Sequence, residues 1–236
     1  MTASTSLKAP VIGQDAPAAT SVPKPVLRIN PAAKAWASFR ENAANHRLTV
    51  LHEQGLYRHF RMSEQGTRMW SWDIVTWPDH LATSGDIADG FTFSRVQDMI
   101  EFFALANGKR AYYADGAPSI DFRYWAEKLQ GDQRNTAKAY VHEEFVQFVT
   151  ETLTERLEDG YHDGLTEEHV AELIAEVNSL EHYESEARDW LSNHEDEFPD
   201  SWENDFKDYT FHFQVACYAI NAAVHAYLEH AGQLAA

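Results

Sequence analysis

A histidine followed by two glutamates is the first stretch whose residue types could support catalysis. His142, Glu143 and Glu144 match the start of the His-Glu-x-x-His pattern, in which two histidines on one helical face bind zinc. Position 146 is Val, so the second zinc ligand is absent. We therefore predict a surface helix with a partly exposed histidine here, and no metal.

A polar strip near the C-terminus is a second candidate for chemistry. Asn221, His225 and Glu229 recur every four residues, so on a helix Glu229 could orient His225 as a general base. Cys217 falls on a different, apolar face, and no other nucleophile can be placed beside the histidine from the sequence. The pattern favours a polar strip that satisfies its hydrogen bonds against a neighbouring helix.

Four aspartates and one histidine lie close together in the chain, on predicted strands and turns: Asp73, Asp79, His80, Asp86 and Asp89. Carboxylates with a histidine could bind a divalent cation. Their spacings match no known metal-binding loop, and aspartates are also common turn residues. If these side chains converge, they would form a metal-dependent hydrolase or nuclease site, which is an alternative function.

The one basic and aromatic cluster comprises Tyr57, Arg58, His59, Arg61, Arg68, Trp70 and Trp72. Nucleic acid bases could stack on such a sheet face. The glycine-rich and aromatic motifs of RNA-binding sheets are missing, however, and tryptophans in strands more often belong to the core. The sequence therefore favours a structural role for this cluster.

Negative charge is concentrated in one segment. Residues 135–208 contain 22 acidic and 4 basic residues, so their net charge equals the −18 of the whole chain, and the remainder is balanced. On the helices expected there, glutamates repeat on the side opposite the apolar residues. The carboxylates that we predict to bind a partner are Glu144, Glu151, Glu155, Glu158, Glu168, Glu172, Glu176, Glu195, Asp196 and Glu197.

Two explanations of this charge remain open. Exposed helix faces normally mix Glu with Lys, because each pair stabilises the helix by a few tenths of a kcal/mol. An acidic proteome would explain the excess, but it should then affect residues 1–134 as well. A surface shaped by a positively charged partner accounts for the localisation, and such a surface disfavours direct binding of nucleic acid or anionic membrane.

Hydrophobic periodicity and turn residues predict an α+β fold. We expect a flexible tail over 1–28, a small antiparallel sheet with flanking helices over 29–134, and an acidic helical region over 135–236 packed on it. The expected helices are 31–45, 94–105, 122–129, 141–157, 167–177, 183–191 and 209–230, the last one central to the C-terminal layer. The expected strands are 48–62, 69–77, 81–84 and 91–93.

Composition bounds the class of protein. A single cysteine excludes an intramolecular disulfide and fits a reducing compartment. No apolar run is long enough for a transmembrane helix, and the N-terminus does not read as a secretory signal, so we expect a cytoplasmic protein. We assign no cofactor and no catalytic residue. Self-assembly through the aromatic-rich residues 46–134 is a further alternative, for an oligomeric structural or regulatory protein.

Several stretches resemble a family of bacteriophage and prophage proteins that has no assigned activity: Leu51–Phe60, Asp73–Pro78, Phe91–Arg95, Tyr124–Leu129 and Tyr209–Tyr227. The resemblance covers most of residues 46–230 and implies a small accessory protein of a mobile element. With the acidic surface, it favours a non-enzymatic binder that imitates the phosphate backbone. The expected partner is a positively charged host nucleic-acid-binding protein, such as a defence nuclease or CRISPR effector, and the protein would act as an anti-CRISPR-like inhibitor in the host cytoplasm.

Overall fold

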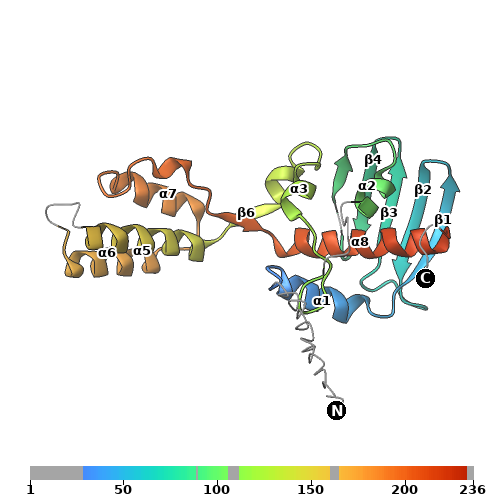
Figure 1. Ribbon diagram of the computed structural model, residues 1–236, viewed down its shortest axis with the longest axis horizontal. Coiled ribbons are helices and arrows are strands. Elements are labelled where there is room, and N and C mark those ends of the chain that lie inside the picture. The colour runs from blue at the N-terminus through green and yellow to red at the C-terminus, as the bar shows by residue number, and fades with distance from the viewer. Residues whose placement is uncertain (1–28, 89, 106–111, 160–164, 233–236) are drawn as a thin grey trace, which may run out of the picture.

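A five-stranded antiparallel sheet lies at the centre of the larger part of the α+β fold (Figure 1). The computed structural model describes residues 29–88, 90–105, 112–159 and 165–232. The five strands follow one another in the sheet in chain order, which confirms the predicted meander. They are β1 (Arg47–Gln54), β2 (Tyr57–Ser63), β3 (Trp72–Trp77), β4 (His80–Gly85) and β5 (Thr92–Ser94).

The predicted strand over 48–62 is in fact a hairpin. Gln54 pairs with Tyr57, and Gly55 between them has a φ of 61°, a conformation that glycine adopts without strain. In the sequence, Leu48, Val50, Phe60 and Met62 all fall on even positions, so the periodicity did not reveal the turn or the β-bulge between Val50 and His52. Strand β3 also begins later than predicted, because Trp70 has a φ of 56° and lies in the preceding turn.

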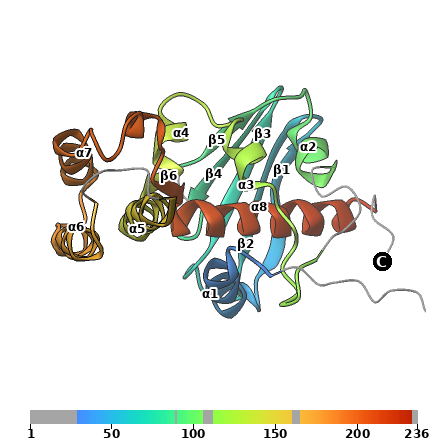
Figure 2. The same cartoon turned by 60° about the vertical axis from the view of Figure 1, so that its left-hand side comes forward.

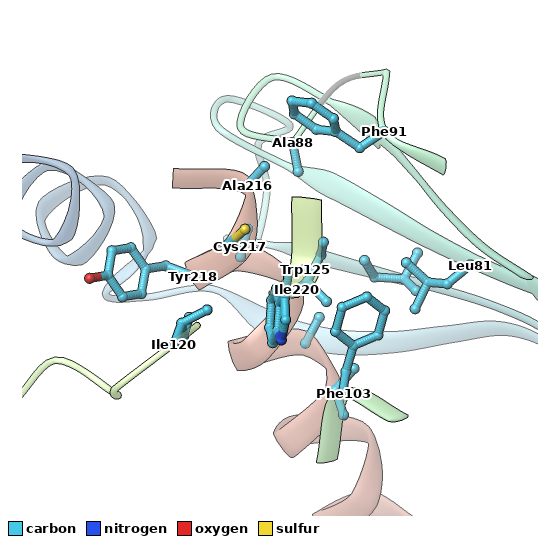
Figure 3. Packing of buried hydrophobic residues seen from close by; sticks show 14 of the residues in the cluster. Leu81, Ala88, Phe91, Phe103, Ile120, Trp125, Ala216, Cys217, Tyr218 and Ile220 are labelled. Atoms are coloured by element: carbon cyan, nitrogen blue, oxygen red, sulfur yellow. The ribbon is translucent and has the colours of Figure 1, made fainter. Parts of the chain in front are cut away.

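Helix α8 (Phe211–His230) crosses one face of the sheet and closes the main core. Its side chains Cys217 and Ile220 are fully buried, as is Trp125 beside them (Figure 3). The indole Nε1–H of Trp72, on β3, donates to the carbonyl oxygen of Ala219 at 3.1 Å. Each large apolar side chain stabilises the fold by about 1.5–3 kcal/mol when buried. Because most side chains of α8 are buried, this helix is the principal cover of the sheet.

The place of α8 corrects the predicted domain boundary. Residues 211–230 were predicted to belong with the acidic helices, but their side chains lie in the hydrophobic core of the sheet domain. The predicted boundary followed the acidic segment, which ends at Asp208. After Asp208 the chain returns to the sheet, so the helix that follows belongs to the sheet core and not to the acidic helices. Helix α8 is apolar around most of its circumference and therefore packs between the sheet and α1 (Ala33–Ala43).

The acidic helices form a separate unit that is inserted into the sheet domain. They are α5 (His142–Asp159), α6 (Glu167–Ser179) and α7 (Glu184–Asn193), and they share a second hydrophobic core. The chain enters through β6 (Lys138–Tyr140) and returns through β7 (Lys207–Tyr209), which pair antiparallel. Figures 1 and 2 show this acidic unit, residues 141–206, projecting beyond the N-terminal end of α8.

Short helices complete the fold: α2 (Met99–Leu105), α3 (Phe122–Ala126), α4 (Gln133–Thr136) and the 3-10 helix η1 (Ser201–Glu203). Two predicted helix starts are wrong. Asn30 accepts from Ala32 N in a turn before α1, and Asp98, in place of Ser94, accepts from Ile100 N at the start of α2. The predicted tail, 1–28, lies outside the described residues. Within the described chain, no helix is long and apolar enough to cross a membrane.

The sheet face opposite α8 carries a charged cluster. Asp73 accepts from Arg61 Nε and Nη2 at 2.6 and 2.7 Å, and His59 Nε2 lies 2.8 Å from the same carboxylate. Burial raises the pKa of Asp73, but the hydrogen bonds and charges of Arg61 and His59 outweigh it, so the net pKa is lowered. This cross-strand cluster joins β2 to β3.

Substituting Asp73→Asn should destabilise the protein by about 1 kcal/mol near pH 7. The folded-state pKa of Asp73 is depressed, so its contribution is present above the unfolded pKa and disappears as the pH falls through the folded value. Urea unfolding at several pH values should therefore show the two proteins converging in strong acid. Glu41→Gln, on the exposed side of α1, is the control; an unchanging difference down to low pH would contradict the assignment.

Replacing residues 141–206 by Asn-Gly should leave the sheet domain folded. Tyr140 pairs directly with Lys207, so a two-residue hairpin turn can join β6 to β7. The core of the sheet domain contains no residue of the removed unit. We expect retained near-ultraviolet circular dichroism and a cooperative thermal transition. A chain that lacks both would show that the acidic unit is required for folding.

Candidate functional site

The acidic unit is positioned by a core that three helices share. Phe145, Val149 and Leu153 recur every four residues along α5 and are fully buried. Val177 of α6 and Trp190 of α7 lie in the same core, and the rings of Phe145 and Trp190 are 6.0 Å apart. Because the apolar stripe of each helix turns inward, the opposite side of each helix faces solvent.

Local sequence fixes the start of α6. The Thr166 hydroxyl accepts from the backbone N–H of His169 at 3.2 Å, as the predicted N-cap requires. Glu167 and Glu168 follow in the first turn, where the positive end of the helix dipole stabilises carboxylates. Part of the negative charge therefore also stabilises the helix that carries it.

The ten predicted carboxylates lie in three groups on the acidic unit. Glu144, Glu151, Glu155 and Glu158 form a column on α5, and Glu168, Glu172 and Glu176 form one on α6. Glu195, Asp196 and Glu197 follow α7. All are exposed except Glu197, which is half-buried. Each column points away from the shared core, so the carboxylates coat several sides of the unit and do not form one flat face.

Three cations of this region lie where the unit joins the sheet domain. Lys138 contacts Asp205 at 3.2 Å, and Lys207 contacts Glu184 at 2.9 Å. Arg188 lies 3.5 Å from Glu184. These carboxylates are outside the three predicted groups, so the ion pairs of the three cations lie at the junction, although the charge of Lys138 also acts on Glu144 of the α5 column.

Carboxylates are dense enough to affect one another's ionisation. Burial raises the pKa of Glu144, and the carboxylates of Asp208 and Asp205 raise it further, whereas Lys138 lowers it. Helix α5 has 18 residues and is about 27 Å long. The −18 is carried by residues 135–208 as a whole, and α5 alone holds six acidic residues and one basic residue. Projected onto the length of α5, the charge of the whole segment gives roughly one charge per 1.5 Å, close to the ~1.7 Å per charge of duplex DNA.

The aspartates of the sheet region are engaged separately. Asp73 is held by Arg61 and His59, and Asp86 accepts from Trp70 N at 2.9 Å. His80 stacks on Trp77 at 5.0 Å, while Asp89 lies outside the described residues. Across the described chain, no group of three or more His, Cys, Asp and Glu side chains is arranged to hold a metal ion. The geometry therefore gives the metal-dependent alternative no support.

The basic and aromatic cluster is divided between different environments. Arg58 forms a two-point ion pair with Asp98, at 2.9 and 2.8 Å, and Trp72 is buried in the core. His59 and Arg61 lie on the opposite face of the sheet with Asp73. These side chains do not form one surface on which bases could stack.

His142 is buried, which corrects the prediction of a partly exposed histidine on a surface helix. Its ring stacks on that of His182 at 4.2 Å, and its side chain faces the α6 side of the bundle. Burial lowers the pKa of His142, and the neighbouring His182 lowers it further. A neutral histidine in this position serves packing between helices.

The polar strip of α8 lines a cavity. Asn221, His225 and Glu229 share it with aromatic residues of α1 and of the segment 112–118. The polar strip was predicted from its spacing, but the aromatic wall was not, since nothing local links Trp36 to a helix that begins 175 residues later. Trp36, one turn inside a predicted helix, was the one sequence feature that could have indicated an aromatic wall.

Comparison with protein-family models, with curated proteins and with solved structures finds no match for this chain.

Proposed function

We propose that the protein is a non-enzymatic binder that places its acidic unit in the positively charged groove of a nucleic-acid-binding protein. One observation carries this proposal: a net charge of −18 is confined to a segment whose exposed carboxylates lie on a projecting unit with its own core. A protruding shape suits insertion into a groove. The charge per length, near that of duplex DNA, suits a site built for phosphates.

The target class follows from electrostatics and from the sequence resemblance. Opposite charges steer encounter and raise association rates by about 10- to 1,000-fold, and salt weakens them. Like charges exclude nucleic acid and anionic lipid from the same surface. The phage and prophage resemblance extends the proposal to a host defence complex, such as a nuclease or CRISPR effector, met in the host cytoplasm.

Reversing the α6 column should abolish most of the binding. The partner is first captured from host lysate on the tagged protein, eluted with a salt gradient and identified. The triple variant Glu168→Lys, Glu172→Lys and Glu176→Lys should then bind it at least about 10-fold more weakly at low salt, with a smaller salt dependence. Duplex DNA should compete with the wild-type protein for the partner.

A matched control separates location from net charge. Glu41→Lys, Glu64→Lys and Glu101→Lys change the net charge by the same amount on exposed positions of the sheet domain. This variant should bind within about twofold of the wild type, since its changes lie outside the acidic unit. Equal weakening by both triple variants, or a partner that DNA does not displace, would contradict the mimicry proposal.

The free edge of the sheet favours self-assembly as a second candidate function. Within the described residues β1 pairs with β2 alone, so its other edge presents unpaired backbone groups. Leu51 is 46 % exposed on this strand and Tyr57, beside the hairpin, is 57 % exposed. Exposed edges of this kind pair readily with another chain.

If the chain assembles through β1, Leu51→Lys should convert the oligomer to a monomer, because edge lysines disfavour strand pairing. Light scattering coupled to size exclusion gives the mass of each protein. Ser84→Lys, exposed on β4 inside the sheet, is the control and should leave the mass unchanged. A wild-type protein that is monomeric at high micromolar concentration would remove this candidate.

A further inference from the structure

A cavity of about 260 Å³ lies between α1, α8 and the segment 112–118. Trp36 and Phe39 of α1 line it, together with Tyr112 and, on α8, Tyr218 and Asn221. Figure 3 shows Tyr218 pointing away from Leu81 of the sheet, so the cavity lies on the far side of α8 from the strands. It is separate from the acidic unit, and the function proposed above does not use it.

The aromatic wall of the cavity is fixed by its own contacts. The ring centroids of Trp36 and Tyr218 are 5.0 Å apart. Tyr218 donates its hydroxyl to Asn30 Oδ1 at 3.3 Å, and Trp36 Nε1 donates to the carbonyl oxygen of Asp115 at 3.3 Å. Asn30 Nδ2 in turn donates to the Asp115 carboxylate at 2.9 Å. A wall held in this way is pre-formed for a flat ring.

Asn221 is the unusual member of the lining. Its side chain is 7 % exposed, and its Nδ2 has no hydrogen-bond partner among the described residues. Buried amides are nearly always paired, because an unpaired donor loses its bonds to water and gains nothing in return. Nδ2 itself is covered in the side-chain conformation of the structure, and rotation of the amide about the Cβ–Cγ bond turns it toward the cavity that Asn221 lines. There a ligand that offers an acceptor can pair with it.

Polarity increases from the interior of the cavity to its mouth. Asn221 is buried, His225 is half-buried and Glu229 is exposed, at successive steps of four residues along one side of α8. Each step advances the helix by about 6 Å. The carboxylate of Glu229 therefore stands near the entrance, where it repels phosphate and can accept hydrogen bonds from hydroxyl groups.

We infer that this cavity binds a purine base or its nucleoside. The Asn221 amide is suited to the adenine edge, where Nδ2 donates to N7 and Oδ1 accepts from the 6-amino group. The ring lies against the aromatic wall, and the ribose hydroxyls reach Glu229. The volume, below the usual range for drug-sized ligands, admits one nucleoside, and the acidic mouth selects against a nucleotide.

Calorimetric titration of the full-length protein with adenosine tests this inference. We expect saturable binding below about 1 mM. Inosine, which lacks the amino group, should bind more weakly, and AMP more weakly still. Asn221→Leu should reduce adenosine affinity at least about 10-fold, whereas Asn178→Leu, the same change at an exposed position of α6, should leave it unchanged. Glu229→Gln should narrow the difference between adenosine and AMP.

A second readout uses the wild-type protein and so does not depend on the folding of a variant. The side-chain amide resonances of Asn221 should shift on addition of adenosine, because its Nδ2 hydrogens gain an acceptor, while those of Asn178 stay in place. No heat and no shift up to about 1 mM adenosine would overturn the inference. Binding that Asn221→Leu leaves intact would overturn it as well.

Discussion

Burial of α8 is the constraint on which the rest of the structure depends. Most side chains of this helix are inaccessible to solvent, so it needs cover on more than one side. The sheet covers one side through Trp72, and α1 covers another through Trp36 and Phe39. Apolar side chains fill most of the interface between α8 and these two neighbours. Asn221 interrupts these apolar side chains, and it lines the cavity between α8, α1 and residues 112–118.

Separation of the acidic residues into an inserted unit resolves a conflict between charge and packing. Carboxylates at this density repel one another, and spread around the main core they would oppose its folding. The unit has its own core around Phe145 and Trp190, and a short ribbon, β6 with β7, connects it to the sheet. Lys138, Lys207 and Arg188 neutralise that connection. The repulsion between carboxylates therefore acts mainly within the acidic unit. The hydrophobic core of that unit stabilises its helices separately from the core of the sheet domain.

Local signals predicted much of this arrangement. Periodicity and the Thr166 cap gave the acidic helices, and turn residues gave the antiparallel meander. The hairpin at Gly55 was missed because the apolar residues on both sides of it fall on even positions of the sequence. Helix α8 was misplaced because the acidic segment and the sheet core end at different residues. The burial of Asn221 could not be predicted, since it depends on contacts between α8 and segments more than 100 residues away.

Two surfaces with different chemistry thus occupy one chain at different places. The acidic unit presents exposed carboxylates, whose attraction for opposite charge is long-ranged and tolerates variation in position. The cavity beside α8 differs, because its polar group is a buried amide and its aromatic rings have fixed positions. Hydrogen bonds to Asn30 and Asp115 hold those rings in place. The acidic unit is tethered through β6 and β7, whereas the cavity is built from α1, α8 and residues 112–118. Because the two surfaces share no residue, a substitution can alter one of them while the other stays intact.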